Sequence, residues 1–435
     1  MDSRKEYQIR RRVLADKLPP HSLAIIPAAS ESLRNGDAHY RFRQDSDFYY
    51  LTGLNEPDAL LLITANPGSE SFLFNLPKDL SKEQWTGMRL GQEAAPEILG
   101  VDKAYPLDSF PMRLVEFMAG RASIYYPISR YPALDNNIKQ AWLLVKDQVR
   151  RGALAPESFH DLTPILSEMR LFKSGAELDL MREAARISVA AHQRAMRFCR
   201  QAEYEYQLEA ELLYEFIREG CRSVAYDPIV ASGDNACILH YTANDKPLRS
   251  GDLLLIDAGG EYKNYAADIT RTYPVNGRFS AEQRQIYELV LRAQKAGIAC
   301  IRPGCAWDKI QKTMVEILTA GLVDLGILQG HTEDLIESEA YKPFYMHQSG
   351  HWLGLDVHDS GRYKLEGEWR TLQPGMVLTV EPGLYFHPDL NCIDRRWRGI
   401  GVRIEDDVHV TADGHENLTH ALAVEVEELE AMIRG

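Results

Sequence analysis

Two aspartates in the segment GDLLLIDAGGEYKNYAADITRTYPV (251–275) are spaced so that their carboxylates could come together in one chemical site. The apolar runs on both sides of its glycines predict two strands joined by a turn. If the hairpin is symmetric with Asp257 opposite Asp268, its turn centres between Tyr262 and Lys263. Directly opposed residues have Cβ atoms about 5 Å apart, so two carboxylates in such positions repel and need a proton or a cation between them. A slipped register that sends one aspartate to solvent explains the segment equally well.

Three histidines follow in FYMHQSGHWLGLDVHDSG (344–361), namely His347, His351 and His358. A lone buried histidine is usually a structural group, but three in so short a stretch favour a ligand or catalytic role. His347 and His351 have the spacing of a helical zinc site. However, Gln348 stands where the HExxH motif has its glutamate, and the glycine that follows weakens a helix. The segment is therefore not predicted to be a helical zinc-peptidase motif.

Two glutamates are embedded in apolar strands nearer the end of the sequence. Glu381 follows PGMVLTV (374–380), and Glu405 shares a strand face with Arg403 in GIGVRIEDDVHV (399–410). A carboxylate in such surroundings is costly unless it is paired or bound to a metal. Arg403 could simply neutralise Glu405, but one arginine cannot also serve Glu381 and the two aspartates.

Four carboxylates and one or more histidines therefore mark the ends or interiors of apolar strands. This oxygen-rich set suits Mn²⁺, Mg²⁺, Co²⁺, Fe²⁺ or a hydrolytic zinc pair better than one structural zinc. Carboxylates can bridge, so two metals about 3.5–4 Å apart are the natural hypothesis. The residues alone predict a two-metal hydrolase and leave open which bond it cuts.

The elements that must position these residues divide the chain in two. Before the boundary, short apolar runs alternate with helical stretches, which predicts an N-terminal α/β domain over residues 1–173. Ser174 and Glu177 have the spacing of a capping box, and an amphipathic helix follows them. Strands then dominate, so residues 174–435 are predicted to form an α+β domain that holds all the residues named above. The expected strands lie at 22–29, 58–65, 71–77 and 122–128, and the later helices at 203–219, 281–299 and 306–325.

Composition excludes several classes of protein. The 435 residues suit two or three domains, and the formal net charge of -14 disfavours nucleic acid and anionic membranes as partners. The six cysteines form no CxxC pair, which favours free thiols in a reducing compartment. The start of the chain has no apolar core of signal-peptide length, and no apolar run could span a membrane. Three arginines at residues 10–12 are compatible with a mitochondrial address, but the acidic residues around them argue against it. A cytoplasmic protein is predicted.

Five separated motifs, taken in order, resemble the metallopeptidases with the "pita-bread" fold, which include methionine aminopeptidases, prolidases and aminopeptidase P. Creatinase shares this shape but lacks the metal ligands, and methionine aminopeptidases lack an N-terminal domain. The segments 41–63 and 83–101 resemble bacterial aminopeptidase P more than prolidase. The resemblance therefore implies an α/β domain followed by a pita-bread catalytic domain. It implies five metal ligands: Asp257, Asp268, His351, Glu381 and Glu405.

The resemblance also implies a mechanism with two divalent ions, of which Mn²⁺ is the expected metal. A hydroxide bridging the ions would attack the carbonyl of the first residue, in peptides that have proline second. Glu381 would act as general base and then acid, and His358 would donate to the oxyanion. Arg403 would bridge Asp257 and Tyr385. The remaining implied substrate contacts are His240, His347 and Tyr385.

The resemblance further implies a homo-oligomer, a tetramer or a dimer, in which the segment of Trp85 reaches a neighbouring subunit. Three alternatives remain open. A prolidase would share fold and metals but cut only dipeptides, and a peptide-binding pseudoenzyme would be expected to lose ligands that are all present here. A metal hydrolase acting on a non-peptide ester has no feature of the sequence in its favour.

Overall fold

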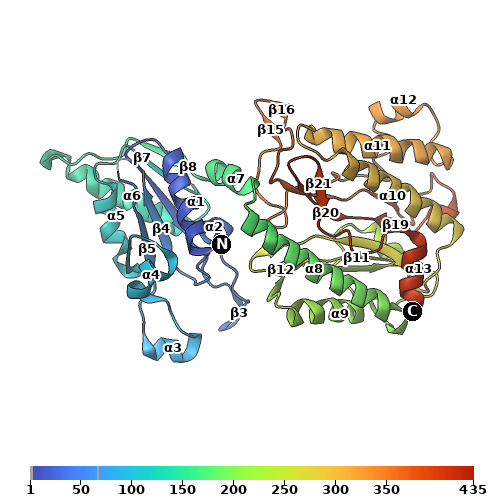
Figure 1. The fold of residues 1–435 in the computed structure, drawn as a ribbon, viewed down its shortest axis with the longest axis horizontal. Helices are drawn as coiled ribbons and strands as arrows, with labels where there is room; N and C mark the ends of the chain where they lie inside the picture. The colour runs from blue at the N-terminus through green and yellow to red at the C-terminus, as the bar shows by residue number, and fades with distance from the viewer. Residues whose placement is uncertain (1–2, 66–67) are drawn as a thin grey trace. The chain divides into compact units, whose positions relative to one another are not determined.

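The computed structural model describes residues 3–65 and 68–435, and these divide into two compact units, Met1–Arg170 and Leu171–Gly435 (Figure 1). Within the part of the chain that is described, no helix has both the length and the apolar character that crossing a membrane requires.

The first unit is built around one mixed six-stranded sheet in the order β6-β5-β4-β1-β7-β8. Its central strands are buried on both faces, because Leu23 and Ile25 of β1 pack on α5 and α6, while Ala24 and Ile26 point the opposite way. A sheet covered in this way is the expected α/β architecture. The strands are β1 (Ser22–Pro27), β2 (Leu33–Asn35), β3 (Ala38–His39), β4 (Leu60–Thr64), β5 (Ser71–Asn75), β6 (Lys103–Pro106), β7 (Ser123–Tyr126) and β8 (Ser158–Asp161). The helices are α1 (Ser3–Lys17), α2 (Ser46–Thr52), α3 (Leu80–Thr86), α4 (Gly91–Leu99), α5 (Phe110–Met118), α6 (Pro132–Asp147) and α7 (Thr163–Leu171).

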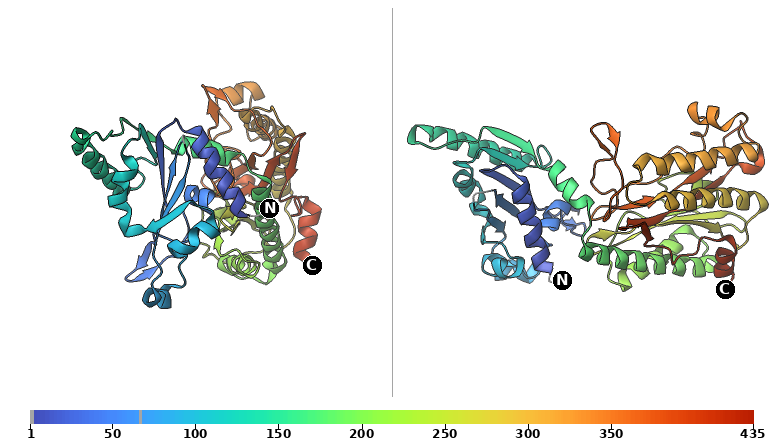
Figure 2. Two further views of the ribbon diagram at one scale, coloured as in Figure 1. Left: turned by 60° about the vertical axis from the view of Figure 1, so that its left-hand side comes forward. Right: turned by 45° about the horizontal axis from the view of Figure 1, so that its top comes forward.

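The second unit places short antiparallel sheets between two pairs of helices, α8 with α9 and α10 with α11 (Figures 1 and 2). The capping box of Ser174 and Glu177 forms at the start of α8. The helices are α8 (Gly175–Phe198), α9 (Glu205–Arg218), α10 (Ala281–Cys300), α11 (Trp307–Asp324), α12 (Thr332–Glu337) and α13 (Val426–Arg434). The strands are β9 (Ser223–Val224), β10 (Ile229–Ser232), β11 (Leu253–Asp257), β12 (Gly260–Tyr262), β13 (Tyr265–Ala266), β14 (Thr270–Pro274), β15 (Lys364–Leu365), β16 (Glu368–Trp369), β17 (Val377–Val380), β18 (Gly383–Phe386), β19 (Ile400–Arg403), β20 (Asp406–Val410) and β21 (His415–Asn417).

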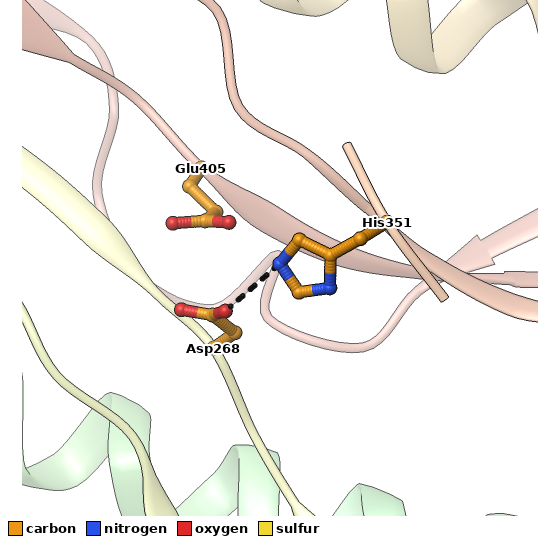
Figure 3. Close-up of side chains that lie close together, drawn as sticks. All are labelled: Asp268, His351 and Glu405. Carbon is orange, nitrogen blue, oxygen red and sulfur yellow. Dashed lines mark ion pairs between the residues drawn. The ribbon is translucent and has the colours of Figure 1, made fainter. Parts of the chain in front are cut away.

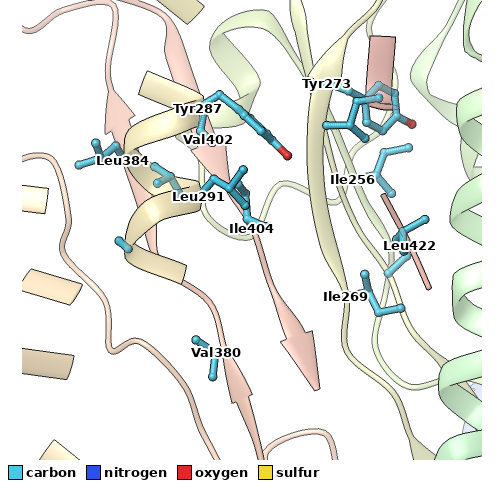
Figure 4. Packing of buried hydrophobic residues seen from close by; sticks show 14 of the residues in the cluster. Ile256, Ile269, Tyr273, Tyr287, Leu291, Val380, Leu384, Val402, Ile404 and Leu422 are labelled. Carbon is cyan, nitrogen blue, oxygen red and sulfur yellow. The ribbon is translucent and has the colours of Figure 1, made fainter. Parts of the chain in front are cut away.

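The core of this unit lies where the helices meet the strands. Tyr287 and Leu291 of α10 point toward Val402 and Ile404, which lie on and just after β19 (Figure 4). All four side chains are at most 5% exposed. Burial of this kind contributes about 25 cal/mol per Å² of apolar surface. It makes β19 a rigid support for the residues at its carboxyl end.

The predicted symmetric hairpin has a different register. Asp257 pairs with Thr270 rather than with Asp268, and the turn centres between Lys263 and Asn264. Both turn residues have positive φ, 48° and 68°, as a two-residue type I′ turn requires. A centre one residue earlier would force the bulky Tyr262 into that left-handed region, whereas Asn264 tolerates it.

The observed register differs from the predicted one by two residues, so Asp268 still lies on the same face of the sheet as Asp257. Asp268 is the diagonal neighbour of Asp257 on the same side. The alternative register, in which one aspartate points to solvent, is therefore wrong. Both aspartates are buried, Asp257 at 8% and Asp268 at 5% exposure.

Candidate metal centre

A cavity of about 680 Å³ in the second unit collects the predicted site residues. Its apolar wall includes Trp307, Tyr363 and Trp369. Every predicted residue except Tyr385 lines it, and these are Asp257, Asp268, His351, Glu381, Glu405, His240, His347, His358 and Arg403.

Three ligand-type side chains converge closely at the floor of this cavity. Ligand atoms of Asp268, His351 and Glu405 all lie within 4.8 Å of one another (Figure 3). The Nε2 atom of His351 lies 3.3 Å from Asp268 Oδ2 and 3.9 Å from Glu381 Oε1. Its Nδ1 lies 3.0 Å from the carbonyl oxygen of Trp352, so Nδ1–H can donate there and leave the Nε2 lone pair for a cation.

The histidine segment reaches this position because it runs alongside β17. The amide of Thr379 donates to the carbonyl of His351, and the amide of Glu381 donates to the carbonyl of Ser349. A Cβ on Gly350 would lie 2.1 Å from the Thr379 carbonyl oxygen, so only glycine permits this approach. Residues 344–361 are all described and contain no helix. The extended pairing, and not a helix, brings His351 beside Glu381.

Asp257 lies at the end of β11 and is held from two sides. The hydroxyl of Tyr226 lies 2.5 Å from Asp257 Oδ1 and 2.5 Å from Asp268 Oδ1. The Arg403 guanidinium donates to Asp257 Oδ2 at 2.5 Å and to the Tyr385 hydroxyl at 3.0 Å. Arg403 therefore makes its hydrogen bonds to Asp257 and Tyr385 rather than to Glu405, although its charge still favours the ionised form of Glu405. Glu405 instead accepts from the Thr270 hydroxyl at 2.7 Å.

The electrostatics of the cluster favour a bound cation. Burial raises the pKa of Glu381 to about 8, although His351 and Arg403 lower it. Burial and neighbouring carboxylates raise the pKa of Asp268 and of Glu405. Burial would lower the pKa of His351, but the hydrogen bond and charge of Asp268 raise it to about 9. Several buried carboxyl groups with raised pKa values cannot easily all be ionised at once. A divalent ion stabilises them as anions, so this set of donors fits a divalent ion.

The candidate substrate histidines surround the same space. His347 Nε2 lies 2.9 Å from the Tyr385 hydroxyl, and burial with the nearby Arg403 lowers the pKa of His347 to about 4. The rings of His351 and His358 are 4.4 Å apart and nearly perpendicular. Burial and the charge of His351 lower the pKa of His358, so at neutral pH it is a neutral imidazole with one N–H to donate. His240 is exposed on the cavity rim.

Two residues that contact the cluster were missed from the sequence. Tyr226 had no local signal, because it precedes β10, whose pairing with β11 requires knowledge of the sheet order. Asp407 is 1% exposed and accepts from the backbone amide of Asp268 at 3.1 Å. Its signal was visible as the third acid of Glu405-Asp406-Asp407, three consecutive acids in a strand that reads as apolar.

The site therefore has the ligands of a metal-dependent enzyme, and the comparisons identify its kind. The family model of Metallopeptidase family M24 matches residues 179–412, and that of Aminopeptidase P, N-terminal domain, matches residues 7–125. The chain is 46% identical to the Xaa-Pro aminopeptidase of Escherichia coli K12 over 433 residues, 99% of this chain and 98% of the relative.

Solved structures agree with this. The aminopeptidase PepP of Pseudomonas aeruginosa superposes with a TM-score of 0.97 at 47% identity, covering 99% of this chain and 98% of that one. Zinc-substituted aminopeptidase P of E. coli in complex with product gives a TM-score of 0.96 at 46% identity, with coverage of 99% and 98%. The chain belongs to the aminopeptidase P family of M24 metallopeptidases. The family and the fold class expected from the sequence are confirmed.

Proposed function

We propose that this chain is an Xaa-Pro aminopeptidase that releases the first residue of peptides with proline in second position. The observation that carries the proposal is the convergence of Asp268, His351 and Glu405 at the floor of the 680 Å³ cavity. The identity of 46% along almost the whole E. coli enzyme supports the specificity for proline.

Five side chains are proposed to hold two divalent ions, with Mn²⁺ as the expected metal: Asp257, Asp268, His351, Glu381 and Glu405. Bound ions of this kind polarise a carbonyl and lower the pKa of water. The zinc-substituted relative supports a divalent centre with this fold.

The remaining roles follow from where the side chains lie. Glu381, as the ionised carboxylate, can take a proton from the attacking water and return it to the proline nitrogen. His358 donates its N–H to the carbonyl oxygen as negative charge develops there. Arg403 fixes Asp257 and Tyr385. His347, held by Tyr385, and His240 contact the peptide.

The N-terminal domain (1–173) is proposed to serve oligomerisation and substrate access, as a tetramer or dimer in the cytoplasm. Trp85 is 89% exposed on α3, and Leu80 at the start of this helix and Met88 just after its end are 80% and 83% exposed. Large apolar side chains gathered this way mark an interaction surface. The assembly is therefore proposed to cover this segment with a neighbouring subunit.

The test is hydrolysis of Ala-Pro-Ala, Ala-Pro and Ala-Ala-Ala by metal-stripped protein resupplied with Mn²⁺. Release of alanine from Ala-Pro-Ala, only with metal and without cleavage of Ala-Ala-Ala, is the expected result. Cleavage of Ala-Pro alone would assign a prolidase. Failure to cleave any of the three would favour the peptide-binding pseudoenzyme.

Two ligand variants test the centre itself. Asp268→Ala and Glu405→Ala should each lose metal and nearly all activity, because each removes a ligand oxygen, while circular dichroism remains that of a folded protein. Full activity in either variant would remove the two-metal centre.

A further inference from the structure

Glu205 is a fully buried carboxylate that lies outside the catalytic cavity. It is the first residue of α9, where the positive end of the helix dipole favours an anion. A buried carboxylate is stable only when its oxygens are satisfied. The donors that satisfy Glu205 all come from one loop, residues 232–246.

Five hydrogen bonds join this carboxylate to the loop. Oε1 accepts from the Ser232 amide at 2.8 Å, the Ser232 hydroxyl at 2.7 Å and the Asn235 side chain at 3.1 Å. Oε2 accepts from the Tyr241 hydroxyl at 2.8 Å and the Lys246 amide at 3.0 Å. Both ends and the middle of the loop are therefore fixed to one side chain.

The same loop supplies part of the catalytic cavity. Leu239, His240 and Thr242 line the cavity, and they lie between the anchoring residues Asn235 and Lys246. The ring of Tyr241 packs in a small apolar cluster with Tyr385, the residue that contacts His347 and Arg403. Glu205 thus determines the position of His240 through the neighbouring residue Tyr241, to which it is hydrogen-bonded.

We propose that Glu205 is a positioning residue for peptide binding: its carboxylate holds the 232–246 loop so that His240 faces the substrate. The inference rests on the proposed function. Glu205 touches neither the metal ligands nor the cavity, so its effect belongs to substrate affinity rather than to the chemical step.

Glu205→Gln is the direct test, because it keeps the shape and replaces one acceptor oxygen by a donor. Whichever way the amide turns, a backbone N–H, of Ser232 or of Lys246, faces another donor. KM for Ala-Pro-Ala should rise about tenfold while kcat changes less than about twofold. The matched control is Glu211→Gln on the same helix, where the carboxylate pairs with Arg194 instead of the loop.

A double-mutant cycle with His240→Ala separates positioning from a general structural role. If Glu205 acts through His240, Glu205→Gln has no further effect on KM in the His240→Ala background. If Glu205→Gln raises KM by the same factor in the His240→Ala background as in the wild type, the proposal is overturned. An unchanged KM in Glu205→Gln alone also overturns it. If Glu205→Gln does not fold, the same cycle with the same criteria uses Tyr241→Phe, which removes only the hydroxyl that lies 2.8 Å from Glu205 Oε2 and 3.4 Å from Asp245 Oδ1.

Hydrogen exchange supplies a readout that does not depend on the proposed activity. The amides of residues 233–240 should exchange faster in Glu205→Gln than in the wild type and in Glu211→Gln. Unchanged exchange would overturn the positioning role even if the enzyme is active. If the wild type cleaves no Xaa-Pro peptide while exchange accelerates, the proposed function fails and the anchoring of the loop stands.

Discussion

At the scale of single residues, the hydroxyl of Tyr226 is the feature that joins the two hairpin aspartates. It lies 2.5 Å from an oxygen of each, although its single proton can bond to only one at a time. The hydroxyl therefore keeps both carboxylates oriented while their remaining oxygens face other partners. A group placed in this way can orient the proposed metal ligands without coordinating the ion itself.

Tyr226→Phe should lower metal affinity about tenfold without unfolding the protein, because partners of ligands typically contribute that much. Metal titration by calorimetry measures the change. Tyr273→Phe is the matched control, since the Tyr273 hydroxyl is buried and has no hydrogen-bond partner among the described residues. Wild-type affinity in Tyr226→Phe would show that the hydroxyl does not orient the ligands.

The residues that line the site were largely predictable from the sequence, whereas a partnership, Arg403 with Asp257 and Tyr385, was available only from the resemblance. Carboxylates such as Glu381 are conspicuous in apolar strands because burial is costly without a partner. The partners come from other segments, as Tyr226 shows for Asp257. Nothing in the spacing along the chain reveals contacts that depend on the order of strands in a sheet.

At the scale of elements, the hairpin of β11 to β14 depends on a glycine at its narrowest point. A Cβ on Gly259 would lie 1.7 Å from the carbonyl oxygen of Ala267 on the opposite strand. The two strands approach closely there, and the approach brings Asp268 to the side of Asp257. The glycine is thus required by the geometry of the site and not by the turn.

Gly259→Ala should destabilise the protein by about 3 kcal/mol or more, because the clash is with backbone and no side chain can yield. Urea unfolding measures this. Gly175→Ala is the control, since no atom lies within 4 Å of the added methyl group and helix propensity favours it by about 0.5 kcal/mol. Equal stability of the two variants would contradict the hairpin geometry.

The contact between α8 and β21 gives a prediction for pH. The Arg182 guanidinium donates to both oxygens of Glu416, at 2.9 and 2.8 Å, and lowers the pKa of Glu416 to about 2. A carboxyl group whose pKa is lower in the folded state stabilises the protein above its unfolded value, 4.5, and loses that contribution as the pH falls toward 2.

Glu416→Gln should therefore lower the free energy of unfolding at pH 7, by less than about 1 kcal/mol because the pair is partly exposed. The difference from the wild type in the free energy of unfolding should shrink between pH 4.5 and pH 3, because the wild type itself loses the contribution of ionised Glu416 in that range. Urea unfolding at both pH values, with exposed Glu428→Gln as the control, measures it. A difference that stays constant with pH would contradict the pairing.

Strand positions were predictable only where the strand is buried, and register was not predictable: β6 and β8 at the edges of the six-stranded sheet were missed, and neither contains a buried residue. The runs at 22–29, 58–65, 71–77 and 122–128 contain β1, β4, β5 and β7. Apolar runs identify strands because burial selects for them. The hairpin register was wrong by two residues because it was inferred from the charges, whereas the turn residues determine it.

At the scale of the whole molecule, α3 is a helix without a buried residue. A helix of seven residues is marginal in water, and here Asp79 caps it by accepting from the amides of Ser81 and Lys82. Such a helix gains little stabilisation from packing against its own chain. Its exposed Trp85 is the basis for the subunit contact proposed above.

Trp85→Ala should reduce the proposed oligomer to a smaller species while leaving the thermal unfolding of the subunit nearly unchanged, because Trp85 is 89% exposed within its own chain. Light scattering after gel filtration measures the mass. Met112→Ala, a second exposed apolar residue on α5 at 75%, is the control. An unaltered mass in Trp85→Ala would place the subunit contact elsewhere.

The residues of the metal cluster come from segments far apart in the sequence, and this has a consequence for synthesis. Asp268, His351 and Glu405 are made in that order, and the amide of Glu405 donates to the carbonyl of Thr270 on β14. A growing chain on the ribosome therefore has an incomplete cluster until β19 has emerged and packed beside β14. A peptidase assembled in this way has no complete centre while most of its own chain is still unfolded and accessible.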